Sequence, residues 1–167
     1  MKEKEEIWDY FVSTVINTLN ADEIYDATMQ ALSDLLCPDG LLLMMNQNTR
    51  HIFSVIRKYG DIAYTKPYSV PTESMLEELN DAPNLIILDE NASHILSLMT
   101  ARQREWLSVE NITAIYTLKY NRVIIGFLYI ANGKQRPLTP DESKYLQKIC
   151  YYFSYALRNA NLYQNAY

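Results

Sequence analysis

The chain has 167 residues, of which 49% are hydrophobic and 21% charged, and its net charge at pH 7 is -5. This composition is typical of one globular domain with a core of its own and excludes an intrinsically disordered chain. The basic residues are scattered and only two cysteines are present, which argues against nucleic-acid binding, a disulfide framework and a cysteine-rich zinc site.

The sequence contains no signal for export or for membrane insertion. Its charged start, Met1 to Glu6, is not followed by the apolar stretch of a signal peptide. No apolar run is long enough to cross a bilayer. We therefore expect a single cytoplasmic domain spanning residues 1–167.

Two helices are predicted before any strand. Apolar residues recur three or four positions apart in Glu5 to Leu19 and again in Ile24 to Leu35, the pattern of amphipathic helices. Asn20 and Glu23 have the spacing of an N-cap pair for the second helix. Cys37 to Gly40 predicts its end near Leu36, because proline cannot continue a helix and Asp-Gly favours a turn.

A first hairpin follows these helices. Leu41 to Asn46 is typical of a short buried strand, and His51 to Tyr59 alternates as a strand nearer the sheet edge does. Gln47 to Arg50 predicts a polar turn between the two strands. Ile62 to Pro71 permits a further edge strand, although its two prolines favour irregular structure.

The middle of the chain predicts short elements. Thr72 or Ser74 is expected to cap a short helix around Met75 to Leu79. Asn84 to Leu88 is typical of a short strand, and Ala92 to Val109 indicates helix in several pieces.

The clearest pattern is a second hairpin that leads into a long helix. Ile112 to Tyr120 and Val123 to Ala131 are apolar, β-rich runs joined by two polar residues, which predicts an antiparallel pair. Thr139, Pro140 and Glu142 form a capping box with proline at the first helical position, so a helix is expected from there to about Tyr163.

This order of elements predicts an α+β protein with an antiparallel sheet of five to six strands. At this level the sequence resembles the GAF family of sensory domains. The resemblance rests on an ordered set of segments, in which leucine replaces the family's usual phenylalanine before the last helix: Asn84 to Asp89, Ile112 to Tyr120, Val123 to Asn132, Leu138 to Glu142 and Ala156 to Tyr163. The PAS domain is the main rival fold, but the two N-terminal helices and the long capped C-terminal helix favour GAF.

The resemblance implies a profilin-like sheet with the N- and C-terminal helices on one face and short helices and loops on the other. It also implies a small-molecule pocket under the middle segment, residues 62–110, in a regulatory domain of a signal transduction protein. The candidate ligand-binding residues are Asp89, Ser93, His94, Trp106, Tyr116 and Tyr129. Asp89 has the alternative role of a helix cap, and the two tyrosines have that of core residues. The ligand or cofactor is unknown.

Other chemistry is not expected. The N-K-F-D-E signature of cyclic-nucleotide-binding relatives is matched only in part, with Leu138 in place of phenylalanine and a spacing one residue short. Methionine sulfoxide reduction and covalent bilin attachment in this family would require a cysteine in the middle segment. This segment has none. His51 and His94 lie far apart and form no metal motif, so no catalytic or metal site is expected. Cys37 and Cys150 are interpreted as buried structural thiols.

The terminal helices predict a homodimer. On the last helix apolar residues alternate three and four apart over three heptads, as in a coiled coil, and part of this seam is equally explained as core, from Leu146 to Phe153. Two copies would form a four-helix bundle through Trp8, Val12, Val15, Phe153, Ala156, Ala160 and Tyr163. The last helix then has the form of a signalling coiled coil that continues toward a downstream output domain or partner.

Three functions are compatible with this sequence. The first is a ligand-binding sensory module. The second is a ligandless dimerisation or protein-interaction module, in which Trp106, Tyr116 and Phe127 fill the space of the pocket. The third is an enzyme, which would need clustered acids, histidines or cysteines that the sequence does not display.

Overall fold

The computed structural model describes residues 3–46, 52–64, 72–132 and 137–166, with side chains described up to residue 162. The chain forms two compact units. The first consists of Met1–Cys37 together with Pro137–Tyr167, and the second of Pro38–Arg136. Each unit is described by itself below.

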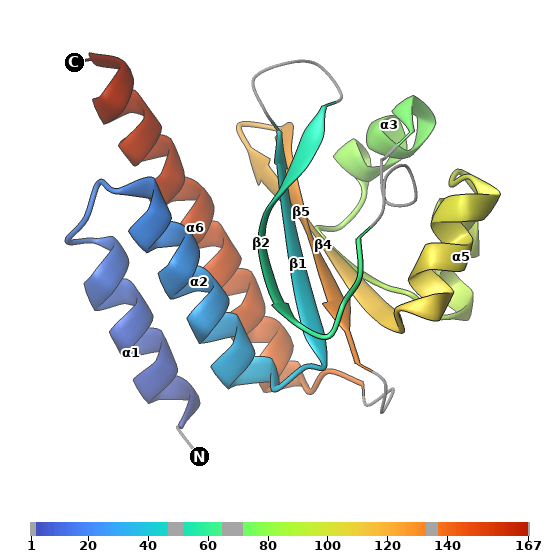
Figure 1. The fold of residues 1–167 in the computed structure, drawn as a ribbon, viewed down its shortest axis with the longest axis horizontal. Helices are drawn as coiled ribbons and strands as arrows, with labels where there is room; N and C mark the ends of the chain where they lie inside the picture. The colour runs from blue at the N-terminus through green and yellow to red at the C-terminus, as the bar shows by residue number, and fades with distance from the viewer. Residues whose placement is uncertain (1–2, 47–51, 65–71, 133–136, 167) are drawn as a thin grey trace. The chain divides into compact units, whose positions relative to one another are not determined.

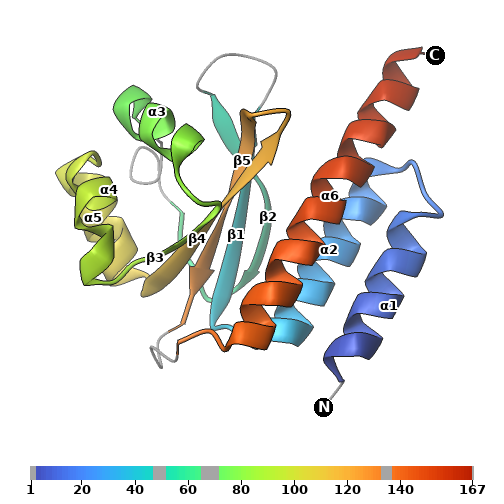
Figure 2. The same cartoon turned by 180° about the vertical axis from the view of Figure 1, so that it is seen from behind.

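The first unit is a layer of three helices, α1 (Lys4–Val15), α2 (Ala21–Leu36) and α6 (Pro140–Ala166). They lie side by side, with α1 and α6 running in the same direction and α2 opposite to both (Figures 1 and 2). Each helix contributes a buried apolar stripe, as the periodicity predicted. An example is the contact between the rings of Tyr25 and Phe153, whose centroids are 5.8 Å apart.

Both predicted helix caps are present. The Glu23 backbone N–H donates to the Asn20 side chain at 3.1 Å. At the start of α6, the Glu142 N–H donates to Thr139 Oγ1 at 3.1 Å, and the Thr139 N–H donates to the Glu142 carboxylate at 2.9 Å. These bonds satisfy N–H groups that a helix start leaves without partners.

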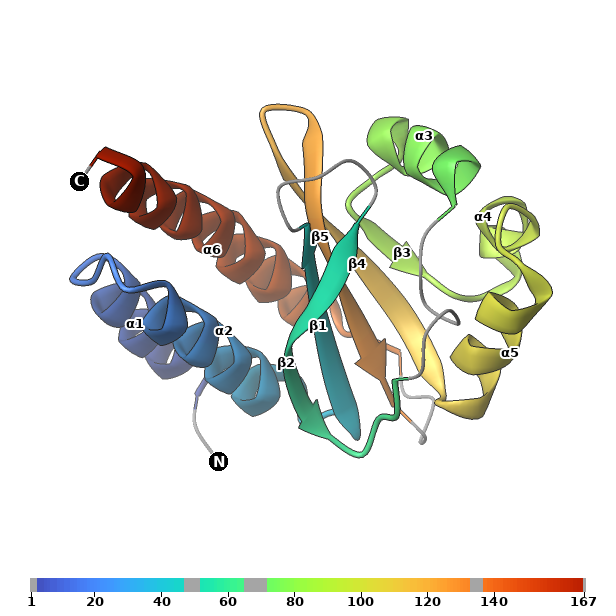
Figure 3. The ribbon, with the colours of Figure 1, turned by 45° about the horizontal axis from the view of Figure 1, so that its top comes forward.

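The second unit contains a five-stranded antiparallel sheet, which confirms the predicted fold class. Its strand order is β2-β1-β5-β4-β3, with the C-terminal hairpin at the centre (Figure 3). The strands are β1 (Gly40–Asn46), β2 (Phe53–Gly60), β3 (Leu85–Ile87), β4 (Ile112–Tyr120) and β5 (Val123–Ala131). The two ends of this unit meet, because Gly40 pairs with Ala131 and the Asp39 N–H donates to the Ala131 carbonyl at 3.0 Å.

Two local features hold the central strands in register. Asn121 and Arg122, between β4 and β5, both have positive φ values, 50° and 65°, as a two-residue type I′ hairpin turn requires. Gly126 of β5 lies opposite Met45 of β1. A Cβ atom at Gly126 would lie 2.5 Å from the Met44 carbonyl oxygen, so only glycine permits this close approach.

The middle segment forms α3 (Glu73–Asp81), the 3-10 turn η1 (Glu90–Ala92), α4 (Ser93–Ser97) and α5 (Ala101–Val109). Thr72 caps α3 by accepting from the Met75 N–H at 3.1 Å, and its hydroxyl donates to the Leu98 carbonyl. Thr100 and Gln103 form a capping box at the start of α5. The sequence analysis did not predict that box.

These helices pack on one face of the sheet and form with it the apolar core of the second unit. Figures 1 to 3 place α3, α4 and α5 together on the same side of the strands. Residues from the sheet and from this segment contribute to the core: Leu42, Met44, Phe53, Ile62, Met75, Leu79, Ile95, Met99, Trp106, Leu107, Ile112, Ile115, Ile124, Phe127, Tyr129 and Ala131.

Some expectations require correction. The first helix ends at Val15 and not at Leu19. Residues 62–64 are not in a strand, while 65–71 and the predicted turn at 47–50 lie outside the described residues. Cys150 is buried as expected, but Cys37 is exposed. Cys37 is the C-cap of α2 in the left-handed conformation, with φ of 45°, a position that lies past the buried stripe of the helix.

Candidate functional site

An aromatic cluster lies where the middle segment meets the sheet. Trp106 of α5 is buried, and its ring stands edge-on to that of Tyr129 of β5, with centroids 5.1 Å apart. Phe127, two residues earlier on the same face, contacts Tyr129 at 6.3 Å and Phe53 at 5.2 Å. The predicted residues Trp106 and Tyr129 are therefore brought together.

The segment that follows β2 is hydrogen-bonded to α5 and its C-cap through one residue, Ala63. The Trp106 indole N–H donates to the Ala63 carbonyl at 2.7 Å. The Glu110 carboxylate accepts from the Ala63 N–H. Both backbone polar groups of Ala63 thus have partners on α5 or its C-cap, and the neighbouring Ile62 and Tyr64 pack in or against the core.

Three hydroxyl groups border this cluster. Burial, with a smaller contribution from neighbouring Tyr64, raises the pKa of Tyr129 well above its usual range, so this phenol stays protonated. Tyr64 Oη and Thr117 Oγ1 are buried and have no hydrogen-bond partner. Buried polar groups are nearly always paired, so these two hydroxyls are exceptions that call for an explanation.

The strand register shows that Thr117 belongs to this surface. Thr117 of β4 lies opposite Phe127 of β5, and Ile115 lies opposite Tyr129. Directly paired residues share a sheet face, and Phe127, Tyr129 and Ile115 belong to the core under the middle segment. Thr117 is fully buried. The sequence analysis missed it, because a threonine inside a β-rich run is typical of any strand.

Tyr116 does not join the predicted ligand-binding group. It lies opposite Leu128, on the sheet face away from the middle segment, because successive strand residues point to opposite faces. The expectation that Tyr116 and Tyr129 present hydroxyls to the same space was therefore wrong. Tyr116 is nonetheless buried.

Three other predicted ligand residues lie at the surface. Asp89 is exposed and accepts from the Asn91 N–H at 2.9 Å, which is the capping role given as the alternative. Ser93 and His94 begin the short helix α4 and are exposed.

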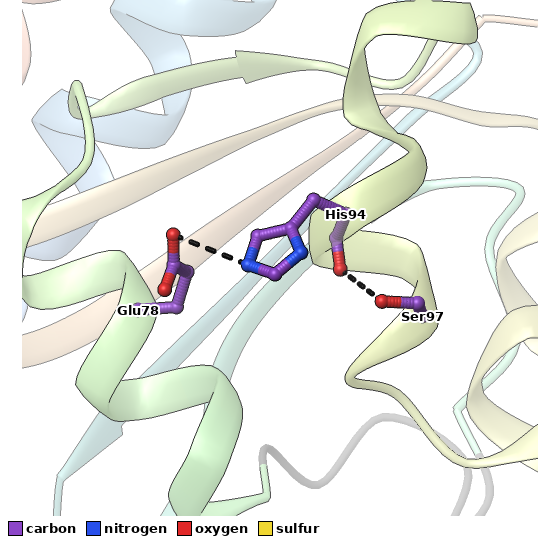
Figure 4. Close-up of polar contacts among 3 residues, drawn as sticks. All are labelled: Glu78, His94 and Ser97. Carbon is purple, nitrogen blue, oxygen red and sulfur yellow. Dashed lines mark hydrogen bonds and ion pairs between the residues drawn. The ribbon is translucent and has the colours of Figure 1, made fainter.

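His94 makes its contact with the neighbouring helix. Figure 4 shows its ring facing Glu78 of α3, with Nε2 3.4 Å from the carboxylate. The Ser97 hydroxyl donates to the His94 carbonyl at 2.6 Å. This pair is exposed, with 67% and 45% of the two side chains accessible, so it lies on the surface and away from the aromatic cluster.

Two findings concern other kinds of site. Among the described residues, no group of three or more histidine, cysteine, aspartate or glutamate side chains is placed to hold a metal ion. Within the same part of the chain, the search for membrane-spanning helices finds none of sufficient length and hydropathy.

The structure places the predicted dimer residues differently. Val15, Phe153 and Ala160 are buried within one chain; of these, only Phe153 lies in the stretch for which core packing was the alternative. Trp8, Val12 and Ala156 are half-buried. The side chain of Tyr163 lies outside the described residues.

A set of exposed aromatic side chains lies beside the half-buried group. We call Tyr151, Tyr152 and Tyr155 of α6 the tyrosine surface; all three are at least 41% exposed, and their rings contact one another. Tyr152 stands edge-on to Trp8 at 5.2 Å. Lys148 Nζ lies 4.4 Å from the centroid of the Trp8 ring, a cation–π contact between α1 and α6.

The arrangement of the sheet and helices can be compared with known proteins. No family model and no curated protein matches the sequence. Several solved structures match over nearly their whole length. The phycoerythrobilin-bound GAF domain from a cyanobacterial phytochrome is 15% identical, with 98% of this chain and 99% of that chain covered and a TM-score of 0.69.

Two further similar structures come from other signalling proteins. The GAF domain of a two-component sensor histidine kinase from Bacillus halodurans is 14% identical, with coverage of 88% and 99% and a TM-score of 0.62. A methyl-accepting chemotaxis protein, residues 122 to 287, is 14% identical, with coverage of 91% and 97% and a TM-score of 0.66. This chain has the GAF-domain fold, and the resemblance found in the sequence is confirmed at that level.

Proposed function

We propose that this chain is a sensory, regulatory module of a signal transduction protein. It binds a small molecule under the middle segment, residues 62–110, and transmits the change through a helical dimer interface. The similar structures from a phytochrome, a sensor kinase and a chemotaxis protein support the signalling role. The module has no catalytic function of its own.

The single observation that carries ligand binding is the pair of buried hydroxyls without partners, at Thr117 and Tyr64. An unpaired buried hydroxyl costs about 1–3 kcal/mol relative to a paired one. A protein that retains two of them on one aromatic core surface gains that free energy when a bound molecule supplies the missing partners. Trp106 and Phe127 give this molecule flat apolar neighbours.

The proposed dimer uses the exposed part of the terminal helices. Trp8, Val12 and Ala156 form its inner part, and the tyrosine surface extends it. Tyrosine is enriched at interfaces because its ring buries apolar area while its hydroxyl keeps a polar partner. A two-fold axis would bring α1 and α6 of both copies into one four-helix bundle, with a downstream output domain as the receiver.

A ligandless interaction module is the second candidate. Trp106 and Phe127 are buried and in ring contact with Tyr129 or Phe53, which supports this alternative, whereas Tyr116, the third residue it named, lies on the other sheet face. In that case the hydroxyls are paired by internal water, and the tyrosine surface alone carries the function.

Native mass spectrometry of freshly purified protein distinguishes the two candidates. A dimer that releases a small mass under denaturing conditions supports the sensor, and that mass identifies the class of ligand. A dimer without added mass supports the interaction module.

Substitution tests the interface directly. Tyr151→Glu places a charge on the tyrosine surface, whereas Tyr59→Glu places one at an exposed tyrosine of β2. We expect Tyr151→Glu to give monomers and Tyr59→Glu to leave the dimer intact. A monomeric wild-type chain, or a Tyr151→Glu dimer as tight as wild type, would contradict the proposed interface.

A further inference from the structure

We propose that the molecule bound under the middle segment is neutral and carries an amide-like polar group that pairs with Thr117 and Tyr64. This inference rests on the proposed ligand-binding function and adds the chemical class of the ligand. It follows from which polar groups face the aromatic core and which of them already have partners.

The core under the middle segment contains no charged side chain among the residues that the structure describes. Every residue of the core cluster is apolar or aromatic. Among the described residues of the second unit, the buried polar side chains are Gln103 and Thr117, and neither is ionisable. An ion brought to this surface would lose its hydration without meeting an opposite charge, which costs several kcal/mol even after relaxation.

The nearby polar and charged groups already have hydrogen-bond partners within the chain. The Gln103 side chain accepts from the Thr100 N–H at 2.8 Å, and the Glu110 carboxylate accepts from the Ala63 N–H. Lys119 Nζ donates to the carbonyls of Asn80 and Ala82 at the end of α3, at 3.3 and 2.8 Å. Each of these groups is thus held by contacts within the chain itself.

The hydroxyls of Thr117 and Tyr64 are the polar groups that remain without partners in this part of the described structure. A hydroxyl both donates and accepts, so Thr117 Oγ1 and Tyr64 Oη together offer two donors and several acceptor sites. A carboxamide, with N–H donors and a carbonyl acceptor, satisfies both kinds of site without a charge. An aromatic or heteroaromatic ring attached to it packs against Trp106 and Phe127, because flat rings prefer stacked or edge-on contacts.

The test compares two probes of the same size that differ in charge. Benzamide is a neutral planar amide, and benzoate is its anionic counterpart. Binding of each is measured at pH 7 by isothermal titration calorimetry on the full chain, after any co-purified molecule has been removed. We expect benzamide to bind wild type at least tenfold more tightly than benzoate.

Two variants on β4 locate the binding. Thr117→Val removes the orphan hydroxyl at nearly constant shape, and we expect it to weaken benzamide binding about tenfold or more. Thr113→Val is the matched control, since the Thr113 hydroxyl already donates to the Ile130 carbonyl at 3.4 Å; it should bind benzamide like wild type. Thermal denaturation of both variants verifies that they fold.

Three results would overturn the inference. They are equal or tighter binding of benzoate, unchanged benzamide binding by Thr117→Val, and no binding of either probe to the wild-type chain. If native mass spectrometry finds a bound anionic molecule, the ligand-binding function stands and the neutral-ligand inference falls. If it finds no bound molecule and neither probe binds, both fall, and the interaction module remains.

Discussion

Replacement of Gly126 by alanine tests how the floor of the candidate site is built. Gly126 lies on β5 one residue before Phe127, and β1 approaches it closely. An added Cβ would lie 2.5 Å from the Met44 carbonyl oxygen, 2.5 Å from Met45 Sδ and 3.3 Å from Leu118 Cδ1, where ordinary contacts are 3.4–4 Å. The methionine side chain has room to rotate, but the carbonyl is part of the strand backbone.

The magnitude follows from this geometry. The backbone of β1 must move by nearly 1 Å in the centre of the sheet, which is overpacking with a typical cost of about 1–3 kcal/mol. Alanine offsets about 0.4–1 kcal/mol of this cost, because it restricts the unfolded chain more than glycine does. The net loss of unfolding free energy is therefore about 1–2 kcal/mol, and for a chain of this length it lowers Tm by roughly 2–8 °C.

Gly40→Ala is the matched control for this experiment. Gly40 is likewise a glycine of the sheet, on β1, but the nearest neighbours of an added Cβ there are Ile62 Cβ at 3.0 Å and the Asp61 carbonyl oxygen at 3.2 Å. Adjustments of a few tenths of an ångström suffice there, so Tm should change by less than half as much. Thermal and urea denaturation followed by circular dichroism measure both variants. A Gly126→Ala Tm equal to or above wild type, or a larger loss in Gly40→Ala, would refute the reasoning.

Three further predictions concern single side chains. Arg122→Gly should raise the free energy of unfolding, measured by urea titration, by about 0.5–1 kcal/mol, because a non-glycine residue at φ of 65° is strained. Asn-Gly is also the preferred residue pair of a type I′ turn. A destabilised variant would contradict this assignment of the turn. An aromatic disulfide reagent at neutral pH should modify one thiol in the native protein, Cys37, and two after denaturation. Cys150 is buried, and burial raises its pKa so that it stays protonated. Rapid modification of two thiols in the native protein would contradict this. Lys148→Met should lose about 0.5–1 kcal/mol of unfolding free energy while Lys148→Arg keeps it, because the cation faces Trp8; equal loss in both variants would mean that the contact depends on shape and not on charge.

The central hairpin and the last helix could be predicted almost to the residue. Each is specified by local sequence, with β-rich runs bounded by a two-residue turn and a capping box that fixes a helix start. The cap at Asn20 succeeded for the same reason. Such signals need no knowledge of the rest of the chain, because their partners lie three or four residues away.

The candidate site could be predicted only in part. Trp106 and Tyr129 lie in ring contact, but Tyr116 lies on the other sheet face, which depends on the register between β4 and β5. A shift of one residue exchanges the two faces of a strand. Thr117 and Tyr64 became visible only when burial and hydrogen bonding were known together.

The terminal helices show a different limit of sequence reasoning. The heptad pattern of α6 correctly identified an apolar stripe, but Phe153 and Ala160 are buried within one chain. A periodic apolar stripe indicates that a helix face is covered, but it does not indicate which part of the protein covers it. The tyrosine surface lies outside the a/d positions of the predicted seam, so the search for a coiled coil passed over it.

The second unit begins and ends on paired strands of the sheet. The chain passes between the two units only twice, after Cys37 and before Pro137. The segments leading to both crossings start from neighbouring strand ends, joined by the bond from Asp39 to Ala131. The sheet and middle segment are thus an insert with adjacent entry and exit points. A slip of β1 against β5 would therefore displace these two strand ends relative to each other.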